Sequence, residues 1–204
     1  ALGSADPLAA FAEGDSFYAP VPRQSAVTLK KATITEYADT TYALVVNTDR
    51  SLLGNESIRQ ALCGVVDRQA IAGVLPEDQS ITTDLVPETA SERTLDYRET
   101  AGSCAALTLP GEPRALFRAG LAAEREQKLP FTELLLPDTQ TDRQAAGLIQ
   151  GSWQNRLGAS INVRPLPEEE LWQRVRAGDY DMALLALSDS TAMGLLEDFS
   201  QDSD

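Results

Sequence analysis

Apolar residues recur along the chain at two periods, and the alternation of these periods predicts strands and helices in turn. Residues 42–47 form a segment that is apolar on both faces up to Asn47, which predicts a strand buried on both faces, as an interior strand would be. After it, apolar residues spaced three and four apart predict a helix that begins at the good N-cap residue Asn55. The same reasoning predicts helices at 6–13, 113–126, 141–157 and 168–177, and strands at 17–21, 31–37, 129–136, 160–164 and 180–187.

The order of these segments predicts the fold class. Strands and helices alternate, which favours an α/β fold with a mixed, mostly parallel sheet flanked by helices. Residues 76–113 are rich in Pro, Thr, Ser and Glu and show little periodicity, so we expect a long irregular surface excursion there. With 204 residues, a single domain is the default expectation.

Charge and apolar run length exclude two classes of partner. The chain carries 17 Lys and Arg residues against 31 Asp and Glu residues, a net charge of -14 that would repel a nucleic-acid backbone. The longest apolar runs, such as residues 182–187, are too short to cross a bilayer. We therefore expect no nucleic-acid partner and no segment that spans a membrane.

The absence of histidine removes several kinds of catalysis. Ser-His-Asp and Cys-His nucleophiles, His-ligated zinc and imidazole proton transfer all require it. The acids Glu168, Glu169 and Glu170 suggest a metal site, but consecutive helical residues point about 100° apart and cannot converge on one ion. We expect three acids in the first turn of a helix, and no cofactor, metal site or catalytic residue.

The two cysteines leave two interpretations open. Cys63 and Cys104 fit no C-x-x-C motif, and a disulfide between them would suit an exported protein. Alternatively, Cys63 is a small buried side chain on its helix. The first seven residues lack the basic and apolar regions of a signal peptide, which we expect processing or the design of the expressed fragment to have removed.

Four segments, taken in order, resemble one family of transport proteins. They are residues 42–47 followed by NESIRQAL from Asn55 and DRQAI from Asp67; ALFRAG at 115–120; LPFT at 129–132 with IQGSWQNRLG at 149–158; and GDYDMA at 178–183. Together they are similar to the extracellular solute-binding proteins of ABC transporters, in the peptide, dipeptide and nickel family known as family 5. Most of these residues are expected to be structural, including Arg59, Asp67, Trp153, Trp172 and Asp181.

The resemblance implies a fold and a function. It implies one lobe of a type II periplasmic-binding-protein-like fold, with residues 1–204 as the second lobe, truncated at its C-terminal part. Ligand would lie between this lobe and a missing first lobe. The implied function is that of a receptor for oligopeptides or a related small solute, and not an enzyme. Its partners would be an ABC-transporter permease and, through an N-terminal anchor absent from this chain, the membrane. We expect an extracellular, membrane-tethered lipoprotein or a periplasmic protein.

Ligand residues are expected at the carboxyl ends of the strands, facing the missing lobe. By position these are Tyr18, Pro20, Asn47, Leu187, Ser188 and Asp189. Relatives that bind peptides typically place an aromatic residue and then an acid in the last loop, where the acid pairs with the peptide's amino terminus. This chain has Leu187 at the aromatic position, Asp189 as the nearest acid, and Phe17 where the family commonly has Asp. These departures concern peptide specificity rather than fold.

Two other functions fit the same chain. The fold also resembles the solute-sensing part of some transcription regulators, and a helix-turn-helix domain upstream would favour that function. An α/β enzyme that uses carboxylates, or a Ser-Lys pair, is the third hypothesis, although no such pair has a recognisable spacing.

Overall fold

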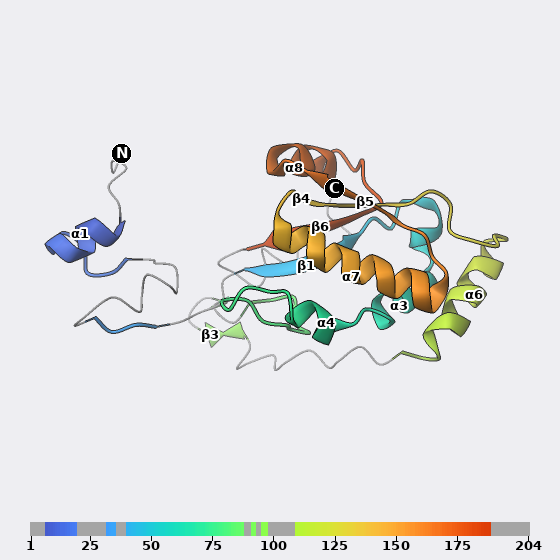
Figure 1. Ribbon diagram of the computed structural model, residues 1–204, viewed down its shortest axis with the longest axis horizontal. Helices are drawn as coiled ribbons and strands as arrows, with labels where there is room; N and C mark the ends of the chain where they lie inside the picture. Colours follow the sequence, from blue (N-terminus) through green and yellow to red (C-terminus); the bar gives the residue numbers. More distant parts are fainter. Residues whose placement is uncertain are drawn as a thin grey trace. The chain divides into compact units, whose positions relative to one another are not determined.

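The computed structural model describes residues 7–19, 32–35, 40–87, 91–92, 95–97 and 109–188. The chain divides into two compact units, residues 1–37 and 38–204 (Figure 1). In the first unit, α1 (Pro7–Glu13) ends at Gly14, whose φ is +85°, as the sequence predicts. The predicted strands at 17–21 and 31–37 are not found in the described residues 17–19 and 32–35. Strand-like sequence is insufficient there, because a strand also needs a neighbour to bond its backbone groups.

The second unit is built on a four-stranded sheet. Its strands are β1 (Thr41–Val46), β4 (Glu133–Pro137), β5 (Asn162–Leu166) and β6 (Met182–Leu187), in the order β1-β6-β4-β5. β4 is parallel to both β5 and β6, whereas β1 is antiparallel to β6. The mixed, mostly parallel sheet is therefore confirmed, but β1 lies at an edge of the described sheet and not in its interior.

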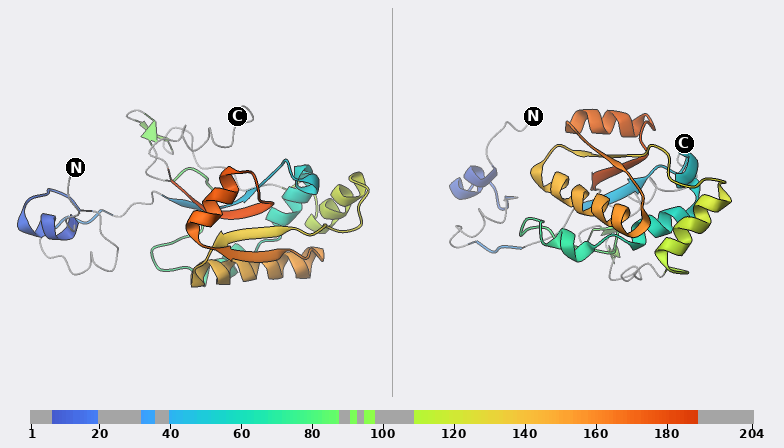
Figure 2. Two further views of the ribbon diagram at one scale, coloured as in Figure 1. Left: turned by 90° about the horizontal axis from the view of Figure 1, so that it is seen from above. Right: turned by 45° about the vertical axis from the view of Figure 1, so that its right-hand side comes forward.

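Helices cover both faces of this sheet, as the alternating pattern predicts (Figure 2). Long α7 (Gln140–Leu157) connects β4 to β5, and α8 (Glu168–Arg176) connects β5 back to β6 on the other side of β4. Because such crossovers are right-handed, opposite directions of travel place the two helices on opposite faces. Three described helices pack against α7, namely α3 (Glu56–Gly64), α4 (Arg68–Ala72) and α6 (Pro113–Ala123), and the short helix η1 (Ser51–Gly54) packs against α3.

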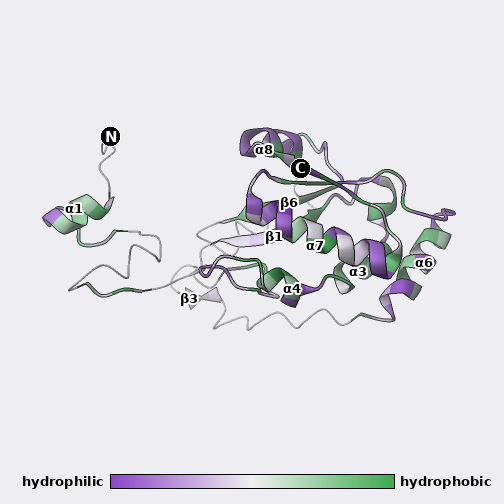
Figure 3. Cartoon of the chain, in the orientation of Figure 1, coloured by the Kyte–Doolittle hydropathy of each residue, from purple (hydrophilic) through white to green (hydrophobic). Residues whose placement is uncertain are grey.

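The central strands are apolar on both faces because each face carries its own core. Leu134 and Met182 belong to the larger cluster under α3, α6 and α7, while Leu135 and Ala183 belong to the smaller cluster under α8. Trp153 of α7 is fully buried in the larger cluster, and its indole N–H donates to the Leu62 carbonyl over 2.9 Å. Figure 3 shows α8 as hydrophilic over most of its surface, and its one buried residue, Leu171, belongs to the smaller cluster.

Helix ends follow the residues that predict them. The Asn55 side chain accepts from the backbone N–H groups of Ser57 and Ile58 and so caps α3. Gly158 adopts the left-handed conformation that ends α7. No helix in the described part of the chain is both long and apolar enough to cross a membrane.

The predicted excursion at 76–113 is described only in part. Its described residues include the two-residue strands β2 (Ser91–Glu92) and β3 (Leu95–Asp96), which pair antiparallel. Val86 is buried and packs against Tyr97, so part of this segment has a small core of its own.

Candidate functional site

The candidate site is the edge of the sheet at which β4, β5 and β6 end. In open α/β sheets, ligands bind outside the carboxyl ends of the strands. β1 runs in the opposite direction, so it contributes its first residues here, and Thr41 lies opposite Leu187. The edge therefore combines the ends of three strands with the beginning of a fourth.

The loop that follows β4 is held rigidly at this edge. The Thr139 hydroxyl accepts from the Asp142 backbone N–H over 3.1 Å, which caps α7, and donates to the Asp142 carboxylate over 2.6 Å. Asp138 accepts from Arg143 Nε over 2.7 Å. The Asp138 backbone N–H donates to the Leu166 carbonyl, which links the ends of β4 and β5. These contacts fix carboxylates beside the strand ends.

Tyr42 is the aromatic residue of this edge, and its side chain is half-exposed. Burial raises the pKa of its phenol, and the negative charges of Asp142, Glu168 and Asp78 raise that pKa further. A half-exposed aromatic ring in the field of several carboxylates can stack against apolar groups and attract cations. No group of acids and cysteines among the described residues could hold a metal ion.

The opposite edge of the sheet is a structural network, and it contains Asn47. The Asn47 backbone N–H donates to the Asp181 carbonyl, and its side-chain amide donates to the carbonyls of Gly178 and Tyr180 over 3.2 and 3.0 Å. The expectation that Asn47 shares an edge with Leu187 is wrong, because β1 is antiparallel to β6. The Asn47 amide instead fastens β1 to the turn that precedes β6.

The other predicted ligand residues are placed in part. Leu187 and the exposed Ser188 lie at the carboxyl edge, with Leu187 mostly buried. Tyr18 belongs to the first unit and is 80% exposed. Pro20 and Asp189 lie outside the described residues.

Only one of the two cysteines of the predicted disulfide lies among the described residues. Cys63 is a free, half-buried cysteine whose thiol pKa is raised by burial. Cys104 lies outside the described residues, so the disulfide between the two stays a prediction.

The motif residues expected to be structural make structural contacts. Arg59 donates to the carbonyls of Leu53 and Gly54 over 2.9 and 2.7 Å. Asp67 caps α4, and Asp181 accepts from the Glu133 backbone N–H over 2.9 Å. Half-buried Trp172 lies beneath the guanidinium of Arg176.

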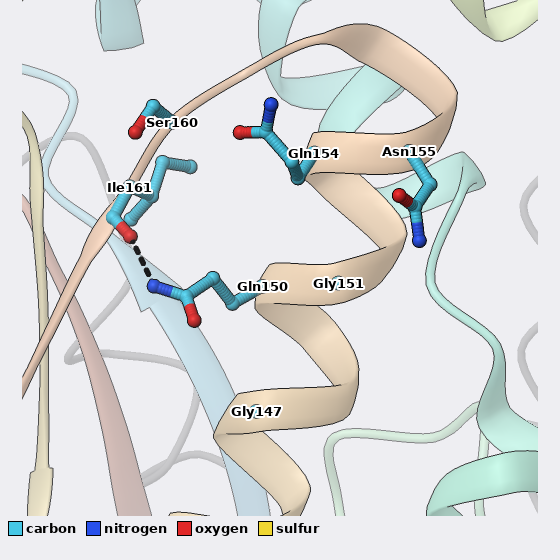
Figure 4. A pocket seen from close by; sticks show the side chains of 7 residues that line it. All are labelled: Gly147, Gln150, Gly151, Gln154, Asn155, Ser160 and Ile161. Carbon is cyan, nitrogen blue, oxygen red and sulfur yellow. Dashed lines mark hydrogen bonds between the residues drawn. The ribbon is translucent and has the colours of Figure 1, made fainter.

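A shallow hollow of about 230 Å³ lies elsewhere, between α7 and the segment that leads into β5 (Figure 4). Gly147 and Gly151 form part of its wall, and the Gln150 side chain crosses it to donate to the Ile161 carbonyl over 2.7 Å. The predicted ligand residues that the structure describes, namely Tyr18, Asn47, Leu187 and Ser188, are not among its lining residues.

Comparison with known proteins identifies the family. Residues 3–199 match the model of the "Bacterial extracellular solute-binding proteins, family 5 Middle". The chain belongs to this family. The family's description as extracellular solute-binding proteins agrees with the four segments that resemble it in the sequence.

Solved structures share the fold of this family 5 protein. The substrate-binding domain of an oligopeptide ABC transporter from Bacillus anthracis str. Ames matches with a TM-score of 0.71 and 18% identity, over 82% of this chain and 34% of that one. OppA of Listeria monocytogenes bound to peptide matches at 0.68 and 21% identity, over 97% and 41% of the two chains. The pheromone receptor PrgZ matches at 0.64 and 21% identity, over 97% and 40%.

The chain thus spans well under half the length of these three structures. The likeness confirms a fold of the periplasmic-binding-protein type, as the sequence predicts. The partial coverage fits a single lobe of that fold. A search among curated proteins finds no match.

Sequence reasoning missed Tyr42, Asp142 and Glu168 as members of this edge. Tyr42 lies in a strand-like run, and nothing in that run indicates the direction of the strand. Asp142 and Glu168 lie in the first turns of α7 and α8, where acids are expected on any helix. One signal in the sequence could have placed these two acids. α7 and α8 each follow a strand of the parallel pair β4 and β5, so the first turn of each helix must lie at the carboxyl edge.

Proposed function

We propose that this family 5 protein is part of a peptide receptor of an ABC transporter, and that peptide lies against the carboxyl edge of its sheet. The observation that carries the proposal is the family match over residues 3–199. Two similar structures add support, since one is described as bound to peptide and the other by its mode of peptide binding.

In this proposal residues 1–204 form the second lobe of a two-lobed clamp. The first lobe closes on the ligand from the other side, and the loaded receptor delivers the peptide to a permease. An N-terminal anchor, as in a lipoprotein, holds the receptor at the outer surface of the membrane. The family's extracellular location supports this arrangement.

The chemistry of the edge suits an extended peptide. Leu187 and Tyr42 offer apolar and aromatic surface, and the exposed Ser188 offers a hydroxyl. Asp142 and Glu168 favour a protonated amino terminus or a basic side chain nearby. Tyr18, Pro20 and Asp189 remain proposed contacts.

The proposal is tested by calorimetry and thermal denaturation with di- to pentapeptides, nickel chelates and oligosaccharides. Selective peptide binding raises the melting temperature by mass action. We expect Tyr42→Ala to weaken peptide binding by about tenfold, which corresponds to about 1.4 kcal/mol. Phe131→Ala is the matched control, because Phe131 is 77% exposed and precedes the start of β4, at the other end of the strand. Binding of another solute class alone would contradict the proposal.

The charge of the edge gives a second prediction. Affinity for a lysine-containing peptide should fall as salt rises, because salt screens exposed charges. Glu168→Gln should weaken that peptide severalfold, while Glu170→Gln, in the same helical turn, should leave it unchanged. An equal effect of both substitutions would indicate general charge attraction and no local contact.

A further inference from the structure

The helices α7 and α8 carry opposite charges at their two ends. Both begin at the carboxyl edge of the sheet, and their first turns contain Asp142 and the glutamates 168–170. Their last turns, at the opposite edge, contain Arg156, Arg174 and Arg176. This arrangement complements the macrodipoles of the two helices, so helix stability alone accounts for it.

Arg143 departs from this arrangement, because it is a base in the first turn of α7. The macrodipole disfavours a positive charge at this end of a helix. Among the described segments that form the carboxyl edge, residues 40–42, 137–143, 166–171 and 187–188, Arg143 is the only Lys or Arg. Its position therefore needs an explanation other than helix stability.

The carboxylate of Asp138 holds the guanidinium of Arg143. Arg143 Nε donates to Asp138 Oδ1 over 2.7 Å, and Arg143 Nη2 lies close to the same oxygen. The Asp138 backbone N–H donates to the Leu166 carbonyl over 3.0 Å, and the Arg143 backbone N–H donates to the Thr139 carbonyl over 3.1 Å. Both charged side chains are about half-exposed, so the pair adds little stability. Its main consequence is that a fixed negative charge balances the positive charge of Arg143.

Other carboxylates of the edge keep their negative field. Asp142 accepts from the Thr139 hydroxyl, which is a neutral partner. Burial raises the pKa of the half-exposed Tyr42 phenol, and the negative charges of Asp142, Glu168 and Asp78 raise that pKa further. A ligand beside Tyr42 therefore meets a surplus of negative charge.

We infer that Asp138 determines the charge preference of the peptide site, because its pairing with Arg143 makes the edge select peptides with basic side chains over peptides with acidic ones. The inference rests on the proposed function, which puts peptide at this edge. An acidic side chain would approach carboxylates there, and the guanidinium that could attract it is already paired. Specificity of this kind needs the repulsive element as well as the attractive one.

Calorimetry on the complete receptor tests the inference with three pentapeptides that differ only in a central Lys, Gln or Glu. At low salt we expect the Lys peptide to bind at least about tenfold more tightly than the Glu peptide. Asp138→Asn should reduce that ratio at least about fivefold, mainly through tighter binding of the Glu peptide. Glu170→Gln is the matched control, because it removes one negative charge from the first turn of α8 and releases no arginine. An equal reduction in the two variants would overturn the inference.

Substitution of Arg143 in two backgrounds separates the ion pair from general charge attraction. In Asp138→Asn the guanidinium is available, so Arg143→Gln should weaken binding of the Glu peptide severalfold. In the wild type the guanidinium is paired, so the same substitution should weaken that binding much less. Equal losses in the two backgrounds would contradict the inference.

The same titrations distinguish failure of the inference from failure of the proposed function. If the three peptides bind with equal affinity, or the Glu peptide binds most tightly, the inference is wrong and the proposed function stands. If none of the three binds, the proposed function fails and the inference fails with it.

The ion pair can also be measured without ligand. In NMR spectra, the Nε–H of Arg143 should exchange with water more slowly in the wild type than in Asp138→Asn, because the hydrogen bond to Asp138 protects it. Equal exchange rates would show that the pair does not form in solution, and the inference would be wrong.

Discussion

Gly120 and Gly147 are both helical glycines, but only Gly120 lies against a neighbouring helix. A Cβ on Gly120 of α6 would lie 2.6 Å from Ile58 Cγ1 and 3.2 Å from the Ile58 backbone nitrogen, whereas a Cβ on Gly147 would meet nothing within 4 Å. Gly120→Ala should therefore destabilise the protein by about 1–3 kcal/mol through overpacking. Gly147→Ala should stabilise it by up to about 1 kcal/mol.

Urea denaturation of the two glycine variants measures this difference. Equal free energies of unfolding would show that α3 and α6 can move apart without cost. The sequence motif around Gly120 predicts a structural residue, but it does not identify Ile58 as the contact. That contact depends on how α3 and α6 pack together, and a local sequence pattern does not predict helix packing.

At the scale of elements, the helix caps are the residues from which the ends of the helices can best be predicted. Asn55 accepts from two backbone N–H groups of α3 and also donates to Glu124 over 2.9 Å. Asn55→Ala should lower the free energy of unfolding by about 1–2 kcal/mol, because both cap bonds are lost. Asn155→Ala is the matched control on exposed α7 surface and should change stability by less than about 0.5 kcal/mol. A similar loss in both variants, seen in chemical denaturation, would contradict the capping role.

Strands are less predictable than helices for a physical reason. A helix satisfies its backbone groups within its own sequence, so Asn55 and Gly158 mark the ends of α3 and α7 correctly. A strand needs a partner, and residues 17–19 and 32–35 have strand-like sequence without forming one. The direction of β1 is likewise absent from its residues, so the sequence predicts Asn47 at the edge opposite to the one where it lies.

At the scale of the whole molecule, the partly buried phenols of Tyr42 and Tyr180 predict a loss of stability in alkali. Burial raises the pKa of Tyr42 and of Tyr180, and nearby acids raise both further. The unfolded chain releases these protons near pH 10, while the folded chain still holds them. Stability from this source is therefore complete below about pH 9 and declines as pH rises past about 10. Urea denaturation at pH 8 to 11 should show a smaller decline for the Tyr42→Phe, Tyr180→Phe double variant.

The α/β class, the lobe and the family all follow from the order of the segments in the sequence. The candidate site can be predicted from the sequence only in part. Leu187 and Ser188 lie at the expected edge. The fold adds three residues that the sequence does not predict there, namely Tyr42, Asp142 and Glu168. These residues are far apart in sequence and meet only because parallel strands end together. Which residues share such an edge is decided by the topology, and the local sequence around each one does not indicate it.

The hydrogen bonds of the Asn47 side chain also bear on when the sheet can form during synthesis of the chain. Its side chain bonds to Gly178, which is 131 residues later in the chain. β1 cannot pair with β6 until the residues between the two strands have left the ribosome. The apolar strand β1 therefore stays unpaired with β6 while those residues are synthesised. Contacts between residues far apart in sequence slow folding and leave aggregation-prone intermediates exposed for longer. The delay suits the exported receptor proposed above, because a chain that has not yet formed its sheet can still cross a membrane unfolded.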